Sequence, residues 1–264
     1  MQTSDSKGTN MQSLMISSLR AVVLAAGLLY SLWTAGDAHA QPAGRVRKPN
    51  ITDTIRANVY ADNWFMLYIN GELVAVDSIA FIPHNVISVD ILPSYPMAIA
   101  VMAKDNADPK TGMEYANTSI GDGGFILKFG DGTVTDGSWK AKAFSHGPID
   151  GDTRNPRVES IPIPDDWYRT DFDDSGWGRA KEYSERDIDP KQPYFEADFK
   201  GAKFIWTDDL LLDNTVLFRR TITKPPDGRQ RPDFTNLNNT VPDGPPKPGG
   251  RRPPGNRDPG GRPR

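Results

Sequence analysis

Hydrophobic residues in this chain occur mostly in short runs that are separated by glycine, proline, asparagine and aspartate. The clearest example is the stretch Asp62–Val76, in which the apolar runs 64–69 and 72–76 flank Asn70-Gly71. Both central residues of a type I′ turn need a positive φ, which asparagine tolerates and glycine adopts freely. This stretch therefore predicts a β-hairpin, and we expect the other strands to stack on it.

Runs of the same kind recur along the chain and predict further strands. They cover residues 51–60, 81–82, 86–92, 97–103, 125–129, 133–135, 138–144, 204–206 and 216–222. The run 97–103 is continuously apolar, as in a strand that is buried on both faces. Residues 104–124 and 145–165 are predicted to be long polar loops, and a short helical turn is predicted within 167–182. Many short strands without a long helical period are typical of an all-β sandwich or jelly roll.

The first forty residues have the pattern of a secretory signal helix. Arg20 precedes the apolar run 21–33, and Ala38-His39-Ala40 forms an A-x-A cleavage site. The run has about thirteen residues, whereas a membrane-spanning helix needs about 20. We therefore expect a secreted protein, periplasmic or extracellular, that is cleaved near Ala40 and has no membrane span afterwards. An uncleaved anchor is the weaker alternative.

The composition changes again at Pro225. Residues 225–264 contain 11 Pro and 7 Gly, with 8 Lys or Arg against 4 Asp or Glu. Such a segment buries little apolar surface, so we expect a disordered basic tail. The whole chain carries a net charge of −3, so its body is acidic, which argues against nucleic acid as a partner. The expected domains are a signal peptide (1–40), a linker (41–50), a β-sandwich (51–224) and this tail.

Three segments in order resemble a known family. They are ADNWFMLYINGELV (61–74), DDWYRTDFDDSGWGRAKEY (165–183) and FIWTDDLLLDNTVLFRRTI (204–222). Together they look like the galactose-binding-like jelly-roll modules that accompany bacterial glycoside hydrolases of the rhamnosidase type, and residues 123–141 are similar to a further strand pair of that family. The resemblance implies a β-sandwich and, in some members, carbohydrate binding without catalysis.

Aromatic side chains and polar loop residues are the candidates for glycan contacts, because an aromatic ring packs on the C–H face of a sugar. Trp64, Trp139 and Trp206 lie within predicted strands, and we expect them in the core. Trp167 and Tyr168 follow a proline-rich loop and are expected to be exposed. The candidate carbohydrate-binding residues are therefore Trp167, Tyr168, His146, Arg154, Asp105 and Asn106. Solvated loops without a ligand are the alternative for the polar members of this set.

A calcium-loop spacing also occurs within the second family-like segment. Asp171, Asp173, Ser175 and Glu182 stand at loop positions 1, 3, 5 and 12, with Gly176 at position 6. The flanking sequence has prolines where an entering helix should run. Capping of a short turn would explain the same residues, so the calcium-site and turn-capping interpretations both stay open. A structural calcium ion is the only cofactor that we expect.

The sequence contains few of the groups that catalysis requires. It has no cysteine, which excludes thiol catalysis and thiolate metal sites, and only 3 His. Neither G-x-S-x-G nor H-E-x-x-H is present. We expect a non-catalytic module that binds a glycan or cell-envelope polysaccharide and so attaches to the cell surface or matrix. A protein-interaction module with an envelope partner is the alternative, and a glycoside-active enzyme is the least favoured class.

Overall fold

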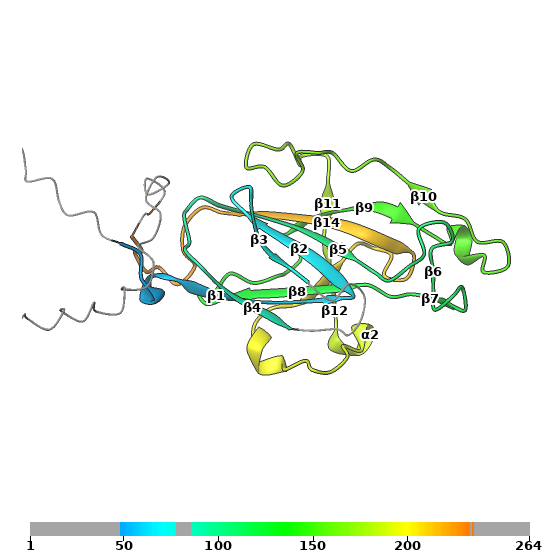
Figure 1. Cartoon of the computed structure of the whole chain (residues 1–264), viewed down its shortest axis with the longest axis horizontal. Coiled ribbons are helices and arrows are strands. Elements are labelled where there is room, and N and C mark those ends of the chain that lie inside the picture. Colours follow the sequence, from blue (N-terminus) through cyan, green and yellow to red (C-terminus); the bar gives the residue numbers. More distant parts are fainter. Residues whose placement is uncertain (1–47, 78–85, 233, 235–264) are drawn as a thin grey trace, which may run out of the picture. The chain divides into compact units, whose positions relative to one another are not determined.

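The computed structural model describes residues 48–77, 86–232 and 234 (Figure 1). The predicted signal helix, the strand expected at 81–82 and most of the basic tail lie outside these residues. No helix within the described part of the chain is long and apolar enough to cross a membrane.

The described chain is mostly β-sheet, and its strand pairs are antiparallel. The first sheet has the order β12 (Lys181–Tyr183), β13 (Phe204–Trp206), β8 (Gly124–Phe129), β1 (Ile55–Asp62) and β4 (Ile87–Ile91). The second has the order β10 (Glu159–Ser160), β9 (Lys140–His146), β14 (Asp213–Ile222), β5 (Met97–Lys104), β2 (Trp64–Ile69) and β3 (Glu72–Val76), and β11 (Gly178–Arg179) also pairs with β9. The all-β prediction is confirmed.

The remaining elements are short. A two-stranded ribbon consists of β6 (Met113–Glu114) and β7 (Ser119–Ile120), and the helical turns are η1 (Ile51–Asp53), η2 (Ile149–Gly151), α2 (Glu185–Ile188) and η3 (Glu196–Phe199). The sequence did not predict α2 or η3, because four residues are too few to show a helical period.

The predicted hairpin forms, but it does not lie at the centre of the fold. Asn70 and Gly71 have φ angles of 50° and 85°, as the turn between β2 and β3 requires. However, β3 is the edge strand of its sheet, and β5 and β14 occupy the middle. The strand β5 is almost wholly buried, as its continuous apolar run predicts.

The main core lies between the two sheets, which gives a β-sandwich-like arrangement. Phe125 on β8 stacks on Phe218 on β14, with ring centroids 5.3 Å apart, and Trp206 on β13 also packs on Phe218 at 5.7 Å. Trp139 and Trp206 are fully buried, as predicted, whereas Trp64, which was also expected in the core, is half-buried. Large aromatic rings that bridge two sheets contribute a major share of the apolar area that stabilises such a fold.

Loops cover the outer faces of both sheets. On the first sheet, residues 188–199 pack over Tyr60, Ile126 and Phe204. On the second sheet, the family-like segment places Trp167 and Trp177 over Ala100, Phe144 and Leu217. These two layers enlarge the core beyond the sandwich itself.

Arg219 fastens the second of these layers to β14. Its side chain is 4% exposed, and its guanidinium binds the Asp174 carboxylate at 3.0 Å and the Arg169 carbonyl at 2.9 Å, as well as the Trp167 carbonyl. The guanidinium also lies 5.2 Å from the centre of the Phe172 ring. A motif of the sequence thus has a structural role, because one buried cation holds the whole turn in place.

The ordered chain continues past Lys224. The Asp227 amide donates to the Asp131 carbonyl at 2.9 Å, and Arg231 pairs with Asp227 at 2.5 Å. Asp131 itself forms the turn after β8 by accepting from the Thr133 amide at 2.9 Å. The segment that begins at Pro225 is therefore joined to the turn after β8 through Asp227, and the domain boundary at Pro225 stays a prediction.

Candidate functional site at the loop end of the sandwich

Three loops meet at one end of the sandwich, where β1 and β5 finish and β14 begins (Figure 1). The backbones of Gly112 and Gly147 approach so closely that a Cβ on Gly112 would lie 2.4 Å from the Gly147 carbonyl carbon. The Asn214 Nδ2 donates to the Gly147 carbonyl at 2.9 Å, and the Gly147 amide donates to the Leu212 carbonyl at 2.7 Å. The structure therefore unites residues 106–123 with residues 147–158 and 207–214. We call this surface the loop end.

A pair of carboxyl groups lies beneath the loop end. Asp105 and Glu114 are 4% and 5% exposed, and a Cβ on Gly121 would lie 2.0 Å from the Asp105 Oδ2. Burial, together with a hydrogen bond to Glu114, raises the pKa of Asp105 to about 10. The two carboxyl groups therefore hold a proton between them at neutral pH. The pair anchors β6 to the end of β5 and is closed to a ligand.

Tyr115 projects from the turn between β6 and β7. Its side chain is among the most exposed large hydrophobic groups of the described chain, with 64% of the residue accessible. Tyr115, Ala116 and Asn117 have φ angles of 47°, 58° and 66°, an uncommon run for residues other than glycine. Hydrogen bonds from the Thr118 amide to the Glu114 carbonyl at 3.0 Å and from the Thr118 hydroxyl to the Tyr115 carbonyl at 2.8 Å hold this turn. Strain of this kind is concentrated at functional positions.

Nearby negative charges act on the Tyr115 hydroxyl. The charge of Glu114 raises the pKa of the Tyr115 hydroxyl most, followed by burial and by the charges of Asp62 and Asp122. Asp122 is half-buried and Asp62 is buried. The phenol therefore stays neutral in the physiological range. The ring offers a neutral apolar face, and among these carboxyl groups Asp122 alone is not buried.

The structure overturns the expected exposure of Trp167. Its ring is 5% exposed and packs edge-on against Tyr68 at a centroid distance of 5.3 Å. Tyr168 is half-buried and stacks on Tyr68 at 4.4 Å, so one face of its ring is covered. Both residues belong to the layer that Arg219 holds on the second sheet, and the proline-rich loop before them does not lift them into solvent.

The four polar candidates differ in their burial and in their hydrogen-bond partners. His146 lies at the loop end and shares a 2.7 Å hydrogen bond between its Nδ1 and the Asp213 Oδ1. Arg154 is exposed in the loop after η2, where its amide donates to the Asp152 carboxylate at 3.0 Å. Asp105 is buried, so neither a glycan contact nor its alternative, a solvated loop, describes it. The Asn106 amide donates to the Asn63 Oδ1 at 2.7 Å, which ties this loop to the end of β1.

The calcium-loop residues do not converge. The Asp171 carboxylate accepts from the Arg169 Nε at 3.2 Å, and the Asp173 carboxylate accepts from the Ser175 amide at 2.9 Å. Glu182 lies on β12 and accepts from the Gly137 amide at 2.8 Å. Throughout residues 48–77, 86–232 and 234, no three His, Asp or Glu side chains are placed so that they could hold a metal ion. The turn-capping interpretation accounts for these residues.

The loop that carries Tyr115 was predicted as a candidate from the sequence, but Tyr115 itself was not. A single tyrosine between Glu114 and Ala116 interrupts no hydrophobic period and belongs to no motif. The turn has positive φ angles at residues other than glycine. The sequence therefore gives no sign of this turn or of the outward position of the ring.

Comparison of the chain with protein-family models, with curated proteins and with solved structures found no match. The galactose-binding-like resemblance therefore stays a prediction from the three sequence segments.

Proposed function

We propose that this chain is a secreted, non-catalytic glycan-binding module with a galactose-binding-like jelly-roll fold, and that it attaches to a cell-envelope polysaccharide through the loop end. One observation carries the proposal, namely the exposed Tyr115 ring on a strained turn beside carboxylates. Binding sites for small ligands combine an apolar contact surface with a few placed polar groups. The signal-like sequence at residues 1–40 supports secretion.

In this proposal the Tyr115 ring packs on the C–H face of a sugar. The half-buried Asp122 carboxylate accepts hydrogen bonds from the sugar's hydroxyl groups, since an ionised carboxylate is an acceptor only. The turn is held by internal hydrogen bonds before any ligand arrives, so little conformational entropy is lost when a glycan binds.

A glycan-array screen of the full chain tests the proposal. We expect binding to a defined set of glycans, and we expect Tyr115→Ala to abolish it. Phe195→Ala is a matched control, because Phe195 is also an exposed aromatic residue, at 59%, but lies just before η3. The screen is run once with calcium and once with a chelator. An equal signal in both would show that glycan binding does not require calcium.

A protein-interaction module is the second candidate, and the edge of the second sheet favours it. The edge strand β3 carries Leu73, which is 50% exposed, and Leu92 after β4 is 40% exposed. An exposed edge strand is a template on which a partner can add a strand. This candidate would be supported if the chain bound no glycan on a broad array and instead bound an envelope protein. The variant Leu73→Lys should then abolish binding of that protein.

A further inference from the structure

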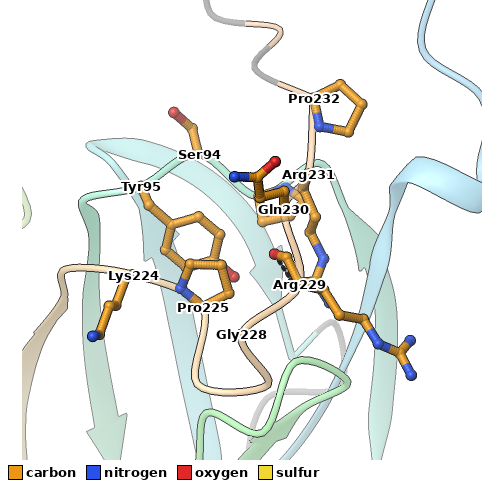
Figure 2. Close-up of a pocket in the computed structure, with 10 residues that line it drawn as sticks. Ser94, Tyr95, Lys224, Pro225, Gly228, Arg229, Gln230, Arg231 and Pro232 are labelled. Atoms are coloured by element: carbon orange, nitrogen blue, oxygen red, sulfur yellow. Dashed lines mark hydrogen bonds between the residues drawn. The ribbon is translucent and has the colours of Figure 1, made fainter.

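A cavity of about 380 Å³ lies at the end of the sandwich opposite the loop end. The pairing of Ile222 with Met97 brings the segment that precedes β5 next to the segment that follows β14. Residues 93–95 form one wall of the cavity, and residues 224–232 form the other (Figure 2). Its volume is within the usual range for sites that bind small molecules.

The charged side chains that line this cavity are all cationic. They are Lys224, Arg229 and Arg231, and the lining contains no aspartate or glutamate. Arg231 is paired with Asp227 at 2.5 Å and is largely buried, so its charge is balanced within the protein. The Arg229 side chain is 81% exposed and its Nε is 3.8 Å from the same carboxylate. Lys224 is exposed as well. Two cations therefore face solvent at the mouth of the cavity.

The surface between these two cations is apolar. The Tyr95 ring and Pro225 lie between Lys224 on one side and Arg229 on the other (Figure 2). A hydrogen bond from the Tyr95 hydroxyl to the buried Asp131 carboxylate fixes the ring in place. An apolar surface flanked by an ammonium and a guanidinium suits a ring-shaped ligand that carries carboxylates, because a guanidinium binds a carboxylate through paired hydrogen bonds.

We propose that this cavity is a binding subsite for an acidic polysaccharide, with one uronic acid ring on Tyr95 and carboxylates on Lys224 and Arg229. The sequence after the cavity supports a polymeric ligand, since residues 233–264 contain 6 Lys or Arg and 3 Asp. A polyanion held at the cavity has further positive charge available along the same chain. The subsite is separate from the Tyr115 site, so either can fail without the other.

The test is a calorimetric titration of the full chain with a trimer of galacturonic acid, with a trimer of galactose as the neutral counterpart. The acidic trimer binds and the neutral trimer does not. The double variant Lys224→Gln and Arg229→Gln weakens binding at least about tenfold, and rising salt weakens binding to the wild type. Arg186→Gln with Lys200→Gln is the charge-matched control, and it changes binding less than about twofold, because both of its residues are exposed and lie outside the cavity lining and outside the loop end.

The proposal is overturned if the double cavity variant binds the acidic trimer as the wild type does, or if both double variants lose affinity equally. Equal binding of the neutral trimer would also overturn it, because the cations would then have no role. Tripolyphosphate provides a third arm of the titration. Binding of tripolyphosphate without binding of the acidic trimer would assign the subsite to phosphate and reject the uronic acid.

Discussion

Replacing Arg219 with alanine is the sharpest test of how the family-like segment is held on the second sheet. The guanidinium is 4% exposed and binds the Asp174 carboxylate as well as the carbonyl oxygens of Trp167 and Arg169. Arg219→Ala leaves three acceptors without their donor and removes the cation that lies over the Phe172 ring.

The size of the effect follows from these contacts. Breaking a buried ion pair by removing one partner costs about 3–5 kcal/mol, mainly because the other groups are left uncompensated. A hydrogen bond to a charged group contributes about 1.5–3 kcal/mol, so three such bonds are enough to account for that range. Asp174 is 30% exposed, which allows water to replace part of the loss and favours the lower end, about 3 kcal/mol.

Urea unfolding of the full chain, followed by tryptophan fluorescence, measures this loss. Arg220→Ala is the control, because the neighbouring Arg220 is half-buried and donates a single bond, to the Ser138 carbonyl at 3.0 Å. We expect the control to lose about 1 kcal/mol. Arg219→Lys should not restore the wild type, because an ammonium cannot span three acceptors as a planar guanidinium does. A loss in Arg219→Ala no larger than that in Arg220→Ala would refute the reasoning.

Three further predictions concern buried groups. Trp167→Ala should lower the unfolding free energy by about 3–5 kcal/mol, since the ring is buried, and an unchanged melting temperature would show that the ring is not packed. Asp105→Asn should stabilise the protein relative to wild type increasingly as pH rises. The folded pKa of Asp105 is raised to about 10, so its stabilising contribution is complete below pH about 4 and declines above, by at most about 1.4 kcal/mol per pH unit. Melting curves from pH 5 to pH 9 measure this trend, and a constant difference between variant and wild type contradicts it. Gly123→Ala should lower the melting temperature in a thermal scan, because its Cβ would lie 2.2 Å from the buried Trp206 ring, whereas an unchanged value would place the ring elsewhere.

The strands could be predicted because their signals are local. The turn at Asn70-Gly71 and the apolar run of β5 each define an element without help from the rest of the chain. The position of the hairpin at the sheet edge was not predictable in this way, because strand order depends on pairing between distant segments such as β5 and β14.

The candidate site was also predicted only in part, because some of its features depend on contacts between distant segments. Trp167 was expected in solvent because a proline-rich loop precedes it, yet the contact that buries its segment involves Arg219, which is 52 residues away in the sequence. Tyr115 was missed because a lone aromatic residue in a polar loop carries no periodic signal. Composition identified both loops as candidates, and tertiary structure decided which side chains reach the surface.

The most direct test of glycan binding at the loop end is a titration of the strongest array glycan against the full chain, Tyr115→Ala and Phe195→Ala. The account predicts that Tyr115→Ala weakens binding at least about tenfold, or about 1.4 kcal/mol, with an unchanged melting temperature. Phe195→Ala should bind as the wild type does. Equal affinity of Tyr115→Ala and wild type would contradict the account and place the glycan elsewhere on the protein.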